Sequence, residues 1–148
     1  MTRIHLFFAV IAFFLLQTSL KAQVTSIPDA NFEQALIDLG IDSDGELNGS
    51  VATADIDQVI SLDVSDKNIA SLTGIQDFEQ LQVLHCQNNV LPSLNIAENT
   101  ELEVLDCSYN TLSSVPVRSN LKLKTLKCSH NNITEINVSY NTDLETLY

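Results

Sequence analysis

Leucine, cysteine and asparagine recur at fixed positions over residues 59–148. The segments LQVLHCQNN, LEVLDCSYN and LKTLKCSHN begin at Leu81, Leu102 and Leu123, and a shorter copy, LETLY, begins at Leu144. These starting positions are evenly spaced along the chain. A unit that is one residue longer starts at Val59 and carries apolar residues at the same positions. A short internal period of this kind is typical of a solenoid that is built from stacked coils.

Within each unit, apolar and polar residues alternate in the stretch x-Leu-x-Cys-x, which predicts one short strand per coil. One unit cannot bury its apolar side alone, so successive units stack and their strands pair in parallel, about 4.8 Å apart. The return side of a coil of about 21 residues is too short for a long helix, so we expect extended or turn-like segments there. The pattern L-x-x-L-x-C-x-x-N-x-L therefore predicts a leucine-rich-repeat solenoid with a parallel β-sheet on one face.

Asparagine fills two columns of the repeat, for which we predict a structural role. Each coil turns sharply after its strand, which leaves buried N–H and C=O groups without partners, and a side-chain amide supplies both a donor and an acceptor. The first column is Asn89, Asn110 and Asn131, and the second is Asn99, Asn120 and Asn141. In the first unit Lys67 stands where asparagine is expected, so we expect an irregular turn there.

The three cysteines form a further column on the inward side of the strands, namely Cys86, Cys107 and Cys128. Neighbouring coils bring such residues within disulfide range, but parallel side chains in register are poorly aimed for the dihedral angle that a disulfide needs. We therefore favour a ladder of buried free thiols over a disulfide. Zinc needs four clustered ligands, which a single column without a histidine on its face does not supply, so we expect no metal.

Residues 23–58 are expected to form an N-terminal cap over the first coil. Asp29 suits a helix N-cap and Gly40 suits the residue after a helix, which predicts a helix over about 29–39. One face of that helix is apolar, with Phe32, Ala35, Leu36 and Leu39. A solenoid needs such a cap because its end otherwise exposes the core and a sheet edge.

The acidic loop 42–50, DSDGELNGS, raises the alternative of a calcium loop. With Gly45 at position 6 of such a loop, Asp42 and Asp44 fall on positions 3 and 5. Positions 1 and 12 would then be Gly40 and Val51, and neither supplies a side-chain oxygen. We therefore interpret this segment as a polar connector and expect no cofactor.

Residues 1–22 are predicted to be an export signal. Arg3 precedes the apolar run from Leu6 to Leu16, and polar residues follow. This run suits the core of a signal peptide and is much shorter than the ~20 residues that a membrane-spanning helix needs. Cleavage after Ala22 would give a secreted or cell-surface protein without a membrane span, and an uncleaved anchor is the alternative.

Three parts of the chain carry a resemblance to a known family. The opening IPDANFEQALIDLGID (27–42), the stretch LDVSDKNIASLTGIQDF (62–78) and the units of 81–143 resemble the secreted leucine-rich-repeat proteins of Bacteroidota-type bacteria and, more loosely, the internalin class. The resemblance implies export and a role in recognition or adhesion, often within a longer chain. Because Leu144 and Leu147 open a further unit, we expect the repeats to continue beyond residue 148.

Charge restricts the classes of partner. The chain has 19 acidic and seven basic residues. Residues 23–148 hold all 19 acids and five of the bases, which gives them a formal charge of −14. Such a chain repels the phosphate backbone of nucleic acids and anionic lipid surfaces, so we expect neither as a partner.

The outward face of the strands is the predicted ligand-binding surface, and the leading hypothesis is an exported module that binds a protein or a glycan. The candidate contact residues are Val83, His85, Gln87, Val104, Asp106, Ser108, Tyr109, Thr125, Lys127 and Ser129. Only Tyr109 and Tyr148 offer aromatic rings, at the margin of this face, so protein ligands are marginally favoured over sugars. A merely solvated sheet is the alternative.

Two other roles stay open, and catalysis is not expected. The module could serve as the accessory binding domain of a larger secreted enzyme whose catalytic domain lies beyond residue 148, or as a structural spacer. His85, Asp106 and Ser108 lie at neighbouring positions of the predicted sheet, where a catalytic triad is conceivable. The sequence supplies neither an oxyanion hole nor a nucleophile elbow for it, so we expect no enzyme.

Overall fold

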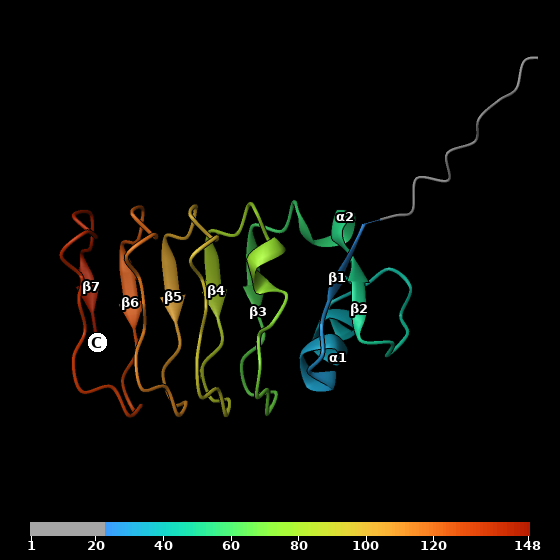
Figure 1. The fold of residues 1–148 in the computed structure, drawn as a ribbon, viewed down its shortest axis with the longest axis horizontal. Helices are drawn as coiled ribbons and strands as arrows, with labels where there is room; N and C mark the ends of the chain where they lie inside the picture. Colours follow the sequence, from blue (N-terminus) through green and yellow to red (C-terminus); the bar gives the residue numbers. More distant parts are fainter. Residues whose placement is uncertain (1–22) are drawn as a thin grey trace, which may run out of the picture.

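A computed structural model describes residues 23–148 and shows a leucine-rich-repeat solenoid, which confirms the predicted fold class. The predicted export signal, residues 1–22, lies outside the described residues. One strand from each coil joins a five-stranded parallel sheet in chain order (Figure 1). The strands are β3 (Ser61–Asp63), β4 (Val83–His85), β5 (Val104–Asp106), β6 (Thr125–Lys127) and β7 (Thr146–Leu147). No helix among the described residues is both long and apolar enough to cross a membrane.

The strands pair between equivalent residues of successive coils. Leu62 lies opposite Leu84, which lies opposite Leu105, and the series continues to Leu126. These four leucines are fully buried and form the spine of one continuous apolar core. The register follows directly from the constant repeat length, because a slip of one residue would turn every leucine out of the core.

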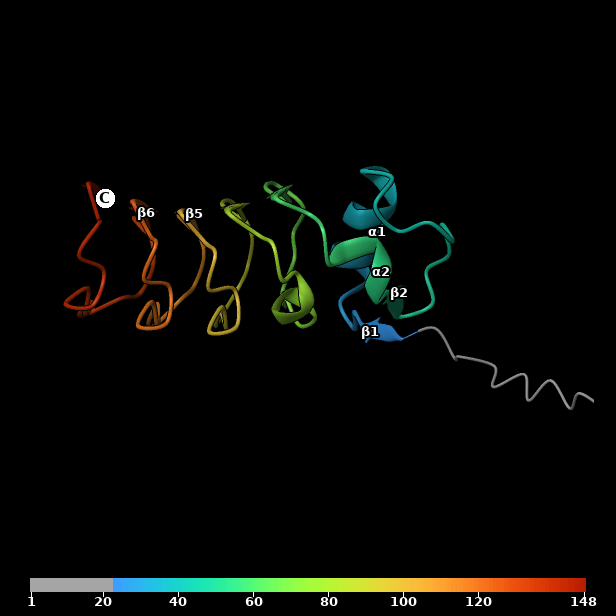
Figure 2. The same ribbon diagram turned by 90° about the horizontal axis from the view of Figure 1, so that it is seen from above.

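The return side of each coil is extended or turn-like, as predicted, and its apolar pairs point into the same core. Figure 2 shows the coils in profile, with the strands along one side and the return segments along the other. Leu94 and Ile96, and one coil later Val115 and Val117, are buried there. A single 3-10 helix, η1 (Ile75–Asp77), lies on the return side of the first coil.

The first asparagine column joins each coil to the one before it. The Asn110 side-chain nitrogen donates to the carbonyl oxygen of Cys107 in its own coil (3.1 Å) and to that of Cys86 in the preceding coil (3.0 Å). Its side-chain oxygen accepts the backbone N–H of Leu91 (3.0 Å), which also belongs to the preceding coil. Asn89 and Asn131 make the corresponding bonds. One amide therefore satisfies backbone groups of two coils.

The second asparagine column performs a similar task in the turns that precede the strands. The Asn120 side-chain nitrogen donates to the carbonyl oxygens of Ile96 (2.9 Å) and Asn99 (2.8 Å), both in the coil before. Asn99 and Asn141 repeat this arrangement, and all three are nearly or fully buried. The turns at both ends of the strands are thus joined from coil to coil by asparagine side-chain amides.

The turn of the first unit is irregular, as the lysine at position 67 predicted. Later coils have one residue in the left-handed region after the strand, at Asn88, Tyr109 and His130, whereas the first unit has two, Asp66 (φ 58°) and Asn68 (φ 56°). This additional left-handed residue lies in the one unit that is longer than the others. The side-chain oxygen of Asn89 accepts the N–H groups of both Lys67 and Ile69, so the next coil still closes the turn.

The cap consists of two short antiparallel strands and two helices. Strand β1 (Val24–Ser26) pairs with β2 (Ser50–Ala52), and helices α1 (Ala30–Asp38) and α2 (Thr53–Ile56) complete it. Phe32 of α1 is fully buried, and its ring centroid lies 6.4 Å from that of Phe78 in the first coil. Leu39 does not pack with the other three residues of the predicted apolar helix face, because α1 ends at Asp38 and the chain reverses at Gly40 (φ 68°), which leaves Leu39 50% exposed.

A single carboxylate fastens the cap to the first coil. One oxygen of Asp29 accepts the N–H groups of Asn31 and Phe32 and so caps helix α1. The other oxygen accepts the N–H groups of Ala70 (2.8 Å) and Ser71 (2.9 Å) on the return side of the first coil. The N-cap that the sequence predicts is therefore also a link between cap and solenoid, which periodicity alone does not reveal.

We predict that Asn110→Ala destabilises the protein by about 1–3 kcal/mol, because it leaves the buried N–H group of Leu91 without its partner and removes one of the two amide donors from the carbonyl oxygens of Cys86 and Cys107. The midpoint of thermal unfolding measures this loss. Asn132→Ala is the matched control, since the Asn132 amide is exposed and makes only one 3.4 Å hydrogen bond. An unchanged midpoint for Asn110→Ala would contradict the structural role of this column.

We predict that Asp29→Asn weakens the junction between cap and first coil by about 1–3 kcal/mol, because an NH₂ group would face two N–H donors. Amide hydrogen exchange should accelerate at Ala70 and Ser71. The control is Asp38→Asn, which removes an exposed pair with Lys67 (3.6 Å) and is expected to change stability by less than about 1 kcal/mol. Equal exchange in both variants would show that Asp29 does not link the two parts.

Candidate ligand-binding face

The outward residues of the strands form regular columns along the solenoid. Val83, Val104 and Thr125 are paired in register at the start of the strands, and His85, Asp106 and Lys127 are paired at their ends. Gln87, Ser108 and Ser129 follow the strands at equivalent positions. Most of these side chains are partly exposed, but Ser108 is only 6% exposed. Ser108 therefore offers little surface to a ligand, unlike the prediction, because its short side chain lies among longer neighbours.

A shallow hollow, here called the sheet hollow, lies on this face across β5, β6 and β7 and the segments that follow β4, β5 and β6. Its lining residues are Gln87, Asn88, Asp106, Ser108, Tyr109, Thr125, Lys127, Ser129, Thr146 and Tyr148. Seven of the ten candidate contact residues line it, and Val83, His85 and Val104 do not. The hollow brings together residues from successive coils, which a linear pattern does not show.

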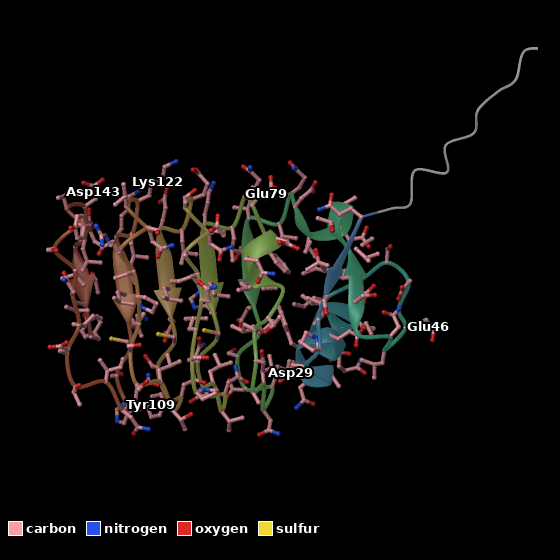
Figure 3. All side chains as sticks on the ribbon, in the orientation of Figure 1. Asp29, Glu46, Glu79, Tyr109, Lys122 and Asp143 are labelled. Carbon is pink, nitrogen blue, oxygen red and sulfur yellow. The ribbon has the colours of Figure 1, made fainter. Side chains whose placement is uncertain are left out.

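Tyr109 and His130 form a stacked pair that sequence reasoning missed. Their ring centroids lie 4.1 Å apart and their planes differ by 10°. Both residues have left-handed backbone conformations, with φ values of 55° and 56°. Asparagine, aspartate and glycine adopt this conformation more readily than tyrosine. The available signal was the constant repeat spacing, which places the two rings in the same column. Figure 3 shows Tyr109 at the lower edge of the sheet.

The basic residues of 23–148 are all engaged with partners inside the chain. Ion pairs join Lys67 to Asp38, Lys122 to Glu101, Lys124 to Glu103 and Lys127 to Asp106. The guanidinium of Arg118 lies over the ring of Tyr140, 4.8 Å from its centroid. Most of the carboxylates have no such cation, so the described surface is predominantly anionic.

Two aspartates of the outward face differ in their surroundings. Asp63 accepts the hydroxyl (2.6 Å) and the backbone N–H (3.0 Å) of Ser65, and these hydrogen bonds hold the pKa of its carboxyl below the usual value. Asp106 accepts the N–H of Ser108 and lies 3.7 Å from the Lys127 ammonium. No hydrogen bond among the described residues joins the side chains of His85, Asp106 and Ser108 into a relay.

The three cysteines are free thiols in one column, but they are not equally buried. Burial raises the pKa of Cys107 to about 12 and that of Cys86 well above its usual value. Cys128 was expected to be buried and is half-buried among the described residues. Burial also raises the pKa of Cys128.

The acidic loop 42–50 closes around a carboxylate of the cap. One oxygen of Glu33, which is buried, accepts the N–H groups of Asn48, Gly49 and Ser50 at 2.7–3.0 Å. Asp42 is also buried, and desolvation raises the pKa of its carboxyl. Within residues 23–148, no group of three or more histidine, cysteine or acidic side chains is arranged to hold a metal ion.

The comparisons with known proteins support the fold. No family model and no curated protein matches the chain. An internalin, InlF, from Listeria monocytogenes is 18% identical with a TM-score of 0.58, and the alignment covers 86% of this chain and 46% of that one. The functional domain of InlJ from the same organism, described as including a cysteine ladder, is 22% identical with a TM-score of 0.43 over 85% and 38% of the two chains. Internalin C2, also from that organism, is 16% identical with a TM-score of 0.41 over 86% and 91%. The chain thus spans less than half of the first two.

We predict that a thiol reagent labels Cys128 much faster than Cys86 and Cys107 in the native protein of residues 1–148. The reason is that Cys86 and Cys107 are buried, which blocks the reagent and raises their pKa values, so that very little of either thiol is ionised near neutral pH. Mass spectrometry after labelling identifies the residue, and Cys128→Ser removes the native signal. Denaturant without reductant should expose three thiols, and finding one instead would reveal a disulfide.

Proposed function

We propose that this chain is a recognition module that binds a protein partner through the outward face of its parallel sheet. The observation that carries the proposal is a regular face of partly exposed polar and small side chains, with a hollow, on a rigid solenoid. Such stacked coils create extended binding surfaces whose residues are held in register by the core rather than by the ligand. Rigid presentation lowers the entropic cost of binding.

The charge of the whole described chain, more than that of the sheet face, indicates which partners fit. Residues 23–100 hold 13 acids and one base, and every cation of residues 23–148 already has a partner in the chain. A partner with a basic or neutral surface is attracted or tolerated, whereas an acidic one is repelled. We therefore expect association with a basic protein to become slower as salt is added.

The proposal includes a location outside the cytoplasm. The apolar run from Leu6 to Leu16 has the length of a signal-peptide core, and small polar residues follow it. A secreted or cell-surface module with a binding face is suited to adhesion. Edman sequencing of the mature protein would test the expected start at Gln23.

Photo-cross-linking tests the binding face. With p-benzoylphenylalanine in place of His85, on the sheet, we expect a discrete cross-linked species in a culture of the producing cells. The matched control carries the same group in place of Asn95, an exposed residue of the return side, and should give little product. Equal products from the two positions would contradict a binding role for the sheet.

A pair of charge variants then tests whether the cross-linked partner binds there. Val104→Arg places a bulky cation in the middle of the outward face and should reduce the yield about tenfold or more, because it blocks close contact. Ala97→Arg adds the same charge on the exposed return side and should leave the yield unchanged. Loss of product in both variants would point to general electrostatics instead of this face.

A further inference from the structure

The sheet hollow contains an even mixture of hydrogen-bond donors and acceptors. Thr125, Ser129 and Thr146 contribute hydroxyl groups, each of which can donate and accept. Gln87 contributes an amide, whose oxygen is buried and hydrogen-bonded to no described residue. A ligand for this hollow must therefore offer several groups that both donate and accept.

The charged groups of the hollow balance each other. Asp106 and Lys127 lie 3.7 Å apart, which is an ion pair too long for a hydrogen bond. Both groups therefore keep hydrogen-bonding capacity for a third molecule that inserts beside them. The side chain of Asp106 is only 14% exposed, so water competes weakly with a ligand for hydrogen bonds to this carboxylate. A neutral ligand fits this balance, whereas an anion meets the strongly acidic protein around it.

The aromatic residues supply an apolar contact beside these polar groups. Tyr109 is 52% exposed and its ring is held in place by stacking on His130, 4.1 Å away. The left-handed backbone at these two positions is the conformation of the repeated turn, because Asn88 adopts it as well. In the sequence Tyr109 stood at the margin of the face, but in the folded chain it is a wall of the hollow.

A pyranose combines these features, because it is neutral, carries several hydroxyl groups and has an apolar ring face. We propose that the sheet hollow binds a pyranose unit of a neutral glycan, with the sugar hydroxyls on Asp106, Lys127 and Gln87 and the ring against Tyr109. This inference rests on the proposed function and makes it more specific. The protein partner that binds the sheet face would carry a glycan, and a sugar of that glycan would occupy the hollow.

The test uses methyl glycosides of glucose, galactose, mannose and N-acetylglucosamine as probes, at millimolar concentration, with the purified protein. Two-dimensional amide NMR should show saturable shifts at Gln87, Tyr109 and Ser129 with at least one glycoside. Glycerol at the same concentration should not produce them. The absence of saturable shifts with all four glycosides, or equal shifts with glycerol, would overturn the proposal.

Variants locate the binding. Asp106→Asn should weaken the responsive glycoside about tenfold, and Thr125→Val, which removes one hydroxyl, about threefold. Valine already occupies the Thr125 column at positions 83 and 104, so the second variant is expected to fold normally. Asp63→Asn is the control, because Asp63 occupies the same column as Asp106 outside the hollow. An affinity unchanged by Asp106→Asn and Thr125→Val would show that the glycoside binds elsewhere.

A polypeptide side chain is the competing occupant. N-acetyl-arginine amide is the probe for it, and shifts of the hollow residues with this probe but with no glycoside would refute the glycan proposal. The cross-linking result stays separate from this test. A partner captured through position 85 by a protein that binds no glycoside would retain the recognition function and reject only the glycan.

Discussion

The solenoid depends on the sharing of one buried amide between two coils. A short coil reverses its direction so tightly that it cannot pair all its own backbone groups, and water does not reach them. The side chain of Asn110 bonds to Cys107 of its own coil and to Cys86 and Leu91 of the one before. Each coil is therefore complete only when its successor is present. Stability is thus a property of neighbouring pairs of coils, as expected for a linear array.

The sequence predicted what depends on periodicity, which is the fold class, the strands, the register and the asparagine columns. Each of these features recurs in every unit, so the repeated pattern reveals it several times over. What the sequence could not show arises from contacts between residues with no shared pattern. The two bonds from Asp29 to Ala70 and Ser71 cross 41 and 42 positions. The burial of Ser108 and the exposure of Leu39 follow from the sizes and directions of local neighbours, which alternation does not encode.

The candidate face illustrates the same division. Periodicity identified its columns, and the in-register pairs such as His85 with Asp106 follow from it. The sheet hollow, the stacking of Tyr109 on His130 and the long contact between Asp106 and Lys127 depend on side-chain length and direction. The position of such a surface can be predicted from the sequence. Its selectivity for a ligand depends on contacts between side chains of neighbouring coils, which only the structure shows.

The cations of the repeat have a consequence for how such an array could grow. Lys122, Lys124 and Lys127 lie close together, around the start of the unit at Leu123, and each pairs with the acid one repeat period before it. The carboxylate of Glu103 raises the pKa of Lys124, and the charges of Glu145 and Asp143 add to this effect from the other side. The backbones are interchangeable, but the charges give the coils an order. If the segment that carries these three lysines were duplicated in tandem, each lysine would lie beside its own copy and repel it. Lengthening this protein therefore requires substitution as well as copying.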